Sequence, residues 1–420
     1  MLNLIGVLVA FIVIIFLIRK KINFGLSLIV GSLIVGVFSL QEIQIIGIPK
    51  AIVQASIYNF ETSKIDTYTV ELALLMTIIF ILAKLMQETG AITKLIDSFR
   101  PIFSKGGTLG VIPALYGLMP VPGGALFSAP SIEEEGNKFK IKPVHKNFLN
   151  VWFRHIWFPI YPISSAMILL CSSQFADIEN IYSLVLVNFP AFFASIIIGI
   201  FYLKKFVNTP LVKEKIKWDY YGFVFLLPPM IPLIFYWVVT TIFDIDMVRA
   251  FLIGMILSII VLYFITKNTF KDYLEKVKKS ITYKLALAIF GIMIFRQMIE
   301  VSKAPEIIGD IIGTLPFPSV VIIILIPLIL GLVTGYNLGA VVLSYPLVEP
   351  FFASSGLSII GFASIIFISS VVGYVISPIH LCNILSCDYL KTDTTRMYRY
   401  YIPAGLFMLL VQSIFIILFF

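Results

Sequence analysis

The chain has 420 residues, of which 59% are hydrophobic and only 13% charged, and its mean hydropathy is +1.01. So few charged side chains cannot cover the surface of a soluble protein of this size, so the composition excludes a soluble globular enzyme and predicts a polytopic membrane protein. The formal net charge of +8 does not indicate a nucleic-acid partner, because the basic residues fall in short loops between apolar segments, where they orient a chain in a bilayer.

Ten apolar segments are about 20 residues long, the length that crosses the hydrocarbon core as a helix. We therefore predict an all-α protein with ten transmembrane helices, at residues 2–18, 22–40, 68–87, 148–170, 182–203, 220–242, 247–266, 283–301, 358–383 and 400–420. The first segment has no basic residue before it and no small-residue cleavage site, so we expect it to be retained as a span.

Two further apolar regions, 107–132 and 319–352, carry proline or glycine at their middle, and each is predicted to be a re-entrant helical hairpin. Irregular backbone at membrane depth is tolerated only where protein or a water-filled cavity covers it. The tips, 120–124 and 334–339, are therefore expected to be buried and to meet near the midplane. They contribute the first predicted substrate or ion ligands, which are Pro122, Gly123, Gly124, Asn337 and Gly339.

The two hairpins resemble each other, which indicates an internal repeat. MPVPGGALFSAPSIEE in the first and GYNLGAVVLSYPLVEP in the second align at one offset, which superposes Gly123 on Gly339 and Pro130 on Pro346. We predict a first repeat over residues 1–204, a basic linker over 205–219 and a second repeat over 220–420. Each repeat holds five spans and one hairpin, and because five is odd, the second repeat enters the membrane from the opposite face and the topology is inverted.

Basic residues gather on alternate loops. Strict alternation of the ten spans places nearly all lysines and arginines on one face, provided that both hairpins are re-entrant. That face is expected to be cytoplasmic, which puts both termini outside the cytoplasm and the protein in the plasma membrane.

Polar side chains follow the proline breaks of the two spans that come after the hairpins. In the first, Arg154 and His155 precede the break at 159–162, and Ser164 and Ser165 follow it. Polar groups at membrane depth are costly and usually functional. The second contributes Ser377, His380 and Asn383 around Pro378.

Each of these residues also has a structural interpretation. Arg154 lies near a loop and can extend its side chain to the membrane surface, and both histidines can be hydrogen-bonded core residues. Asn337 can cap its own half-helix. Glu300 lies four residues after Arg296, so an intrahelical ion pair is the default interpretation of these two residues.

The three cysteines, Cys171, Cys382 and Cys387, show no metal-type spacing with the three histidines, so we expect them to be small apolar core residues. The sequence contains no metalloprotease motif of the HExxH type. No cofactor is predicted, and a metal ligand set is left unassigned.

The predicted order of elements resembles that of the ion transporter superfamily. It consists of three spans, a re-entrant hairpin, a broken span and one more span, and the whole set is then repeated in inverted form. Its members include divalent-anion/sodium symporters, gluconate permeases, and arsenite and Na⁺/H⁺ antiporters. The segment MPVPGGALFSAP, with the chain length, is similar to an uncharacterised prokaryotic membrane family within it. The Ser-Asn-Thr signature of the dicarboxylate symporters is absent, so the resemblance does not carry over a substrate. It does imply a homodimer and an elevator-type mechanism.

These observations predict a secondary active transporter, not an enzyme, that moves a small solute coupled to Na⁺ or H⁺, by symport or exchange. An anion, such as a carboxylate, is expected because Arg154, His155, Arg296 and His380 give the presumed cavity more positive than negative groups. The alternatives are an ion channel, or an intramembrane hydrolase that uses a Ser/His pair from the two broken spans. The sequence does not distinguish Na⁺ from H⁺.

Overall fold

The computed structural model describes residues 2–103, 106–118, 123–207, 220–243, 245–313 and 318–420, with the backbone alone for 311–313. It is built of helices, apart from two strands of two residues each, β1 (Tyr58–Asn59) and β2 (Lys64–Ile65), which pair antiparallel. Because seven of the described helices are long and apolar enough to cross a membrane, the chain is an all-α membrane protein.

The first half of the chain contains eleven α-helices and one short 3-10 helix within the described residues. They are α1 (Leu2–Arg19), α2 (Phe24–Phe38), α3 (Leu40–Ser56), α4 (Tyr68–Glu88), α5 (Ala91–Phe99), α6 (Thr108–Gly117), α7 (Ala125–Lys138), α8 (Pro143–His155), η1 (Phe158–Ile160), α9 (Ser165–Cys171), α10 (Ile181–Val187) and α11 (Phe189–Phe206).

The second half contains eleven α-helices and two 3-10 helices within the described residues. Its described helices are η2 (Tyr221–Leu226), α12 (Leu227–Ile242), α13 (Met247–Ile265), α14 (Phe270–Ser280), α15 (Tyr283–Val301), α16 (Ala304–Gly313), α17 (Ser319–Thr334), α18 (Asn337–Val348), η3 (Glu349–Phe351), α19 (Phe352–Ser355), α20 (Ile359–Val375), α21 (Leu381–Tyr389) and α22 (Thr394–Phe419).

Among the described residues, seven helices are long and apolar enough to cross a membrane, or eight if the bent pair that joins 270–301 to 304–310 is counted as one span. Several of the ten predicted spans are therefore not single long helices. The segment predicted at 182–203 is divided between α10 and α11, because Pro190 occupies the first turn of α11 and cannot continue the hydrogen bonding of α10. The segments predicted at 148–170 and 358–383 are broken at their prolines, as expected from the sequence.

The region between the second and third spans is a helix and a strand pair rather than an irregular loop. It was predicted only as a loop, but α3 occupies 40–56 and β1 and β2 follow it. The loop after α4 likewise contains α5, whose apolar residues Ile92, Leu95 and Ile96 are buried, and which packs against η2 of the other half.

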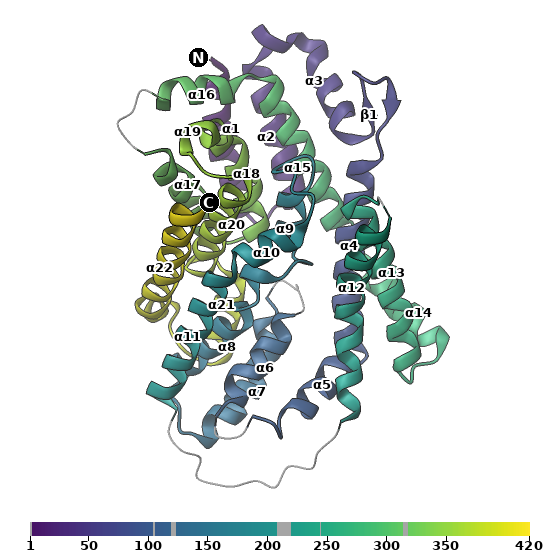
Figure 1. The fold of residues 1–420 in the computed structure, drawn as a ribbon, viewed down its shortest axis with the longest axis vertical. Helices are drawn as coiled ribbons and strands as arrows, with labels where there is room; N and C mark the ends of the chain where they lie inside the picture. Colours follow the sequence, from purple (N-terminus) through teal and green to yellow (C-terminus); the bar gives the residue numbers. More distant parts are fainter. Residues whose placement is uncertain (1, 104–105, 119–122, 208–219, 244, 314–317) are drawn as a thin grey trace.

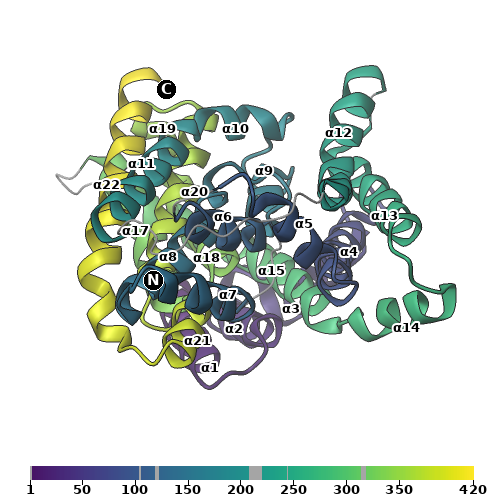
Figure 2. The ribbon, with the colours of Figure 1, turned by 90° about the horizontal axis from the view of Figure 1, so that it is seen from below.

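Helices of one half pack against helices of the other. α2 contacts α15 and α4 contacts α13, while α7 contacts α21 and α18 contacts α9. α2 and α15 approach each other closely at Gly25 and Gly291, where a Cβ atom would overlap the facing backbone. The absence of a side chain at these two positions permits the contact. α4, α12, α13 and α14 lie on one side of the molecule and α11, α17 and α22 on the other (Figures 1 and 2).

Two helical hairpins enter the molecule from opposite ends. α6 and α7 pack against each other, as do α17 and α18. The open end of the first pair lies near α5, at the bottom of Figure 1, and that of the second lies near α16, at the top. The ends of the second hairpin meet, since Ser319 and Ser354 are hydrogen-bonded through their hydroxyls at 2.7 Å. α6, α7 and α17 have 10, 14 and 16 residues and are each at most about 24 Å long, less than the hydrocarbon core of about 30 Å. α18 continues through η3 and α19, and the segment Asn337–Ser355 is one of the seven that are long enough to cross a membrane.

Candidate functional site

A cavity of about 240 Å³ lies where the two broken segments and the two hairpin tips come together. α4 and the start of α15 close its remaining side. Its lining comes from both halves of the chain and consists of Met76, Ile79, Phe80, Gly123, Arg154, His155, Phe158, Ser164, Ser165, Ala166, Leu285, Gly335, Tyr336, Asn337, Leu338, Tyr374, Leu381 and Cys382. We call it the central cavity.

The proline breaks expose backbone groups beside this cavity, and neighbouring side chains satisfy several of them. Asn188 donates from Nδ2 to the carbonyl of Pro159 at 2.9 Å, and Ser377 donates from Oγ to the carbonyl of Leu332 at 2.6 Å. Ser164 caps α9, since its Oγ accepts from the amide of Met167 at 3.2 Å. Hydrogen bonds from neighbouring side chains therefore stabilise the broken conformation of these segments.

Several helices begin at the central cavity. α18 begins at Asn337 and α21 at Leu381, both of which line it, and α7 begins directly after Gly123 and Gly124. The first amides of a helix lack intrahelical partners, and the helix dipole makes this end positive. These helix starts each contribute a positive potential to the cavity, whereas α8, α17 and α20 end beside it, near His155, Gly335 and Tyr374, and contribute the opposite sign.

Arg154 adds a full positive charge to the same wall. Its side chain is only 4% exposed, and Nη1 donates to the carbonyl of Tyr116 at 2.7 Å. The interpretation that Arg154 extends to the membrane surface is therefore wrong. Gly117 and Gly124 make room for it, because a Cβ atom at either position would overlap Arg154. None of the described lining residues is acidic.

Asn337 lies at the tip of the second hairpin and lines the central cavity. Its Oδ1 accepts a hydrogen bond from Ser370 of α20 at 2.9 Å, and its side chain is 7% exposed. The N-cap of α18 is Tyr336, which makes no side-chain cap. The capping interpretation of Asn337 is therefore wrong, and the side chain joins the hairpin tip to the adjacent broken segment.

His155 and His380 lie side by side, with ring centroids 4.8 Å apart, although they come from different halves of the chain. Cys382 completes the group, and one nitrogen of each ring and the sulfur all lie within 4.8 Å of one another. The sequence predicts Cys382 to be a small core residue, and it is buried, but it also lies beside His155 of the other half, a contact that spacing along the chain does not report. Tyr374 contacts both rings.

The other predicted site residues are placed as follows. Gly123, Ser164 and Ser165 line the central cavity, together with Arg154, His155 and Asn337. His380 is buried behind Tyr374, and Gly124 supports Arg154. Gly339 packs against Phe24, Ser377 bonds to α17, and Asn383 accepts from Asn147 at 2.9 Å, so these three do not reach the wall. Pro122 lies outside the described residues.

Three polar or titratable residues of the wall are not among the site residues predicted from the sequence: Tyr336, Tyr374 and Cys382. Tyr336 adjoins Asn337 at a predicted tip, and Tyr374 precedes a predicted break, so a rule that takes every polar residue near a break would have found both. Cys382 follows Pro378 by four residues, but the lack of a metal-type spacing with the histidines predicts a small core residue there.

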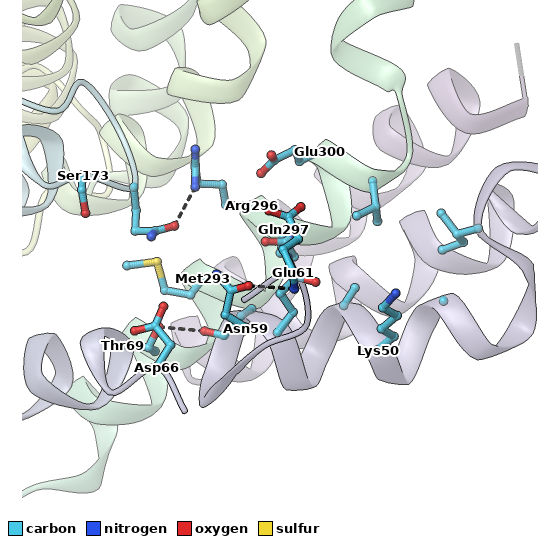
Figure 3. A pocket seen from close by; sticks show the side chains of 17 residues that line it. Lys50, Asn59, Glu61, Asp66, Thr69, Ser173, Met293, Arg296, Gln297 and Glu300 are labelled. Atoms are coloured by element: carbon cyan, nitrogen blue, oxygen red, sulfur yellow. Dashed lines mark hydrogen bonds between the residues drawn. The ribbon is translucent and has the colours of Figure 1, made fainter. Parts of the chain in front are cut away.

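A second, larger cavity of about 570 Å³ lies between α3, β1 and α15 (Figure 3). Polar and charged side chains line it, among them Lys50, Glu61, Asp66, Arg296 and Glu300. Arg296 donates to Gln174 at 2.9 Å rather than forming the expected ion pair with Glu300. We call this the polar vestibule. It is not the candidate site, since it touches neither hairpin tip nor either break.

The fold and the central cavity define an α-helical membrane protein with a buried, positively charged site between two broken segments and two hairpins. The chain belongs to the family described as protein of unknown function (DUF401), whose model matches residues 2–418. Because the match covers nearly the whole chain, the family model includes the helices of both halves. A search of the curated proteins finds no match.

Proposed function

We propose that this protein is a secondary active transporter that binds a small anion in the central cavity. The observation that carries the proposal is the composition of the cavity wall. Arg154 and the starts of α7, α18 and α21 surround a cavity whose described lining has no acidic side chain. A negatively charged solute is the partner that such a wall stabilises.

In this proposal α6–α7 and α17–α18 are re-entrant hairpins that open to opposite faces of the membrane. α6, α7 and α17 are too short to cross the hydrocarbon core, and the open ends of the second hairpin, at Ser319 of α17 and Ser354 of α19, are hydrogen-bonded to each other. The two halves are then inverted repeats, with ten crossings and both termini outside the cytoplasm. The basic loops support this orientation in the plasma membrane.

The polar vestibule provides an access route from outside the cytoplasm. Thr69 of α4 and Met293 of α15 line the vestibule, whereas Met76 and Leu285 of the same helices line the central cavity. The two cavities are therefore about two helical turns apart, or roughly 10–12 Å. A solute that enters between α3 and α15 meets Arg296 before it reaches Arg154.

We also propose that transport is coupled to Na⁺ or H⁺. The hairpins and the broken segments then move as one body against a second body, which consists of α1, α2, α4, α12, α13 and α15. The resemblance to the ion transporter superfamily supports this elevator-type mechanism and a homodimer. A hydrolase has less support, since the hydrogen-bond partners of His155 and His380 among the described residues are backbone carbonyls and Tyr374, and no serine is among them.

Uptake by the purified protein in proteoliposomes tests the proposal. A panel of radiolabelled succinate, citrate, gluconate and sulfate is offered with an inward Na⁺ gradient, with a pH gradient and with neither. We expect saturable uptake of at least one anion that depends on one gradient. Passive current through the vesicles without saturation identifies a channel instead, and chemical conversion of the solute without a gradient identifies an enzyme.

A further inference from the structure

We propose that His155, His380 and Cys382 form a binding site for a soft, singly charged metal ion, Cu⁺, in the wall of the central cavity. All three side chains are at least 95% buried, and they come from the two broken segments. The inference concerns binding to the folded protein and does not depend on the transport proposal.

Each histidine has its Nδ1 held by a backbone carbonyl, which leaves Nε2 for a metal ion. Nδ1 of His155 lies 2.6 Å from the carbonyl of Val151, and Nδ1 of His380 lies 3.4 Å from the carbonyl of Val375. A carbonyl only accepts hydrogen bonds, so each Nδ1 carries the proton and each Nε2 carries a lone pair. This is how metal-binding histidines are held, with the second nitrogen fixed by a carbonyl or carboxylate.

The lone pairs are available to an ion. Nε2 of His380 is buried and has no hydrogen-bond partner, which is costly for a polar atom. Nε2 of His155 has only a long contact of 3.3 Å, from the hydroxyl of Tyr374. A metal ion between the rings satisfies both nitrogens, and Tyr374 is then free to donate elsewhere.

The spacing of the three ligand atoms suits one ion. They lie within 4.8 Å of one another, whereas bonds of about 2.0 Å to nitrogen and 2.3 Å to sulfur place ligand atoms roughly 3.5–3.8 Å apart in a trigonal site. An inward movement of at most about 1 Å closes the site. Cys382 lies in the first turn of α21, where the helix dipole favours a thiolate.

Charge and ligand type select the ion. One thiolate neutralises Cu⁺ completely, whereas a divalent ion keeps a net positive charge in a buried wall that already holds Arg154. Thiolate and imidazole ligands bind Cu⁺ well, and hard ions such as Mg²⁺ and Ca²⁺ require oxygen ligands that this group lacks. The structure therefore favours a soft monovalent ion over Zn²⁺.

Metal binding to the purified full-length protein tests the site, with Ag⁺ as a redox-inert probe and Cu⁺ in competition with a chromogenic chelator. We expect one ion per chain. Cys382→Ser should weaken binding at least about 100-fold, since loss of an outer-shell partner alone costs 10–100-fold. The matched control is Cys387→Ser, which removes a second buried cysteine of the same helix and should leave affinity unchanged.

A measurement on the unaltered chain guards against variants that fail to fold. X-ray absorption of the Cu⁺-loaded protein should show one sulfur and two imidazole nitrogens around the metal. Absence of a stoichiometric ion, equal binding by Cys382→Ser, or a preference for Zn²⁺ over Ag⁺ would each overturn the proposal.

Discussion

Arg154 is the residue on which the charge of the central cavity depends. A hydrogen bond to a charged group contributes about 1.5–3 kcal/mol, which corresponds to roughly 10–150-fold in affinity. We therefore expect Arg154→Gln to weaken anion uptake by about that factor, measured as the apparent KM in proteoliposomes. Arg296→Gln, which removes an arginine from the polar vestibule, is the control and should change KM less. Equal effects of the two variants would contradict the assignment.

Asn337 allows a test of the sign of the solute's charge. Asn337→Asp keeps the shape of the side chain and the acceptor for Ser370, but adds a negative charge to the wall. We expect this variant to lose anion uptake more completely than Asn337→Ala, because like charges repel strongly in a buried site.

Ser370→Ala is the companion to the Asn337 variants, since it removes the same hydrogen bond without adding a charge. It should retain most of the uptake. If Asn337→Asp binds anions as well as Asn337→Ala does, the central cavity does not hold an anion beside this residue.

At the scale of elements, the second hairpin can be tested by a cross-link. The hydroxyls of Ser319 and Ser354 lie 2.7 Å apart, so cysteines at both positions should form a disulfide under mild oxidation. The native cysteines are buried and should not interfere. We expect a mobility shift on a non-reducing gel for the double variant and none for either single variant. Failure to cross-link would show that the hairpin ends do not meet.

The first hairpin is tested by labelling from one side of the membrane. Cysteines placed at Lys138, at the end of α7, and at Lys105, which lies outside the described residues, should react from the same, cytoplasmic side. A membrane-impermeant maleimide applied to intact cells and to inverted vesicles distinguishes the two sides. Labelling from opposite sides would mean that α6 and α7 cross the membrane as one span.

Most helices could be predicted from the sequence, and the reason is local. Apolar length predicts α1 and α4 to within one residue at each end, and proline predicts the breaks at 159–162 and at Pro378. Apolar length does not predict the helix α3 in the segment 40–67. This segment mixes Glu42, Pro49 and Lys50 with apolar residues, so it is too polar to be recognised as a membrane span.

The candidate site was predictable only in part. Positions next to a break, such as Arg154 and Asn337, follow from the rule that polar groups at membrane depth are functional. The grouping of His155 with His380 and Cys382 depends on contact between the two halves. No spacing rule within one segment reports such a contact.

At the scale of the whole molecule, we expect a homodimer. Large apolar side chains on the outer faces of α1, α12 and α13 are exposed, including Phe16, Trp237 and Phe264. In the proposed elevator-type mechanism these helices belong to the body that stays fixed, so we expect their faces to be available to a second copy as well as to lipid. Native mass spectrometry from lipid nanodiscs should give twice the chain mass, and a monomer that retains full uptake would count against the dimer.

The hydrogen bonds between α8 and α21 have a consequence for how the protein is made. Asn147 donates to Asn383 at 2.9 Å and Asn150 to Ser386 at 2.8 Å, each across 236 residues of chain. During translation α8 therefore enters the bilayer long before these partners exist. Asn150 already has Ala125 and Ser128 of α7 as partners, but the side-chain amide of Asn147 stays unsatisfied or hydrated until Asn383 and Tyr401 are made. The nascent amino-terminal half must wait, incompletely packed, for almost the last helix to be synthesised. A ribosome that stops before α21 leaves behind a substrate for membrane quality control.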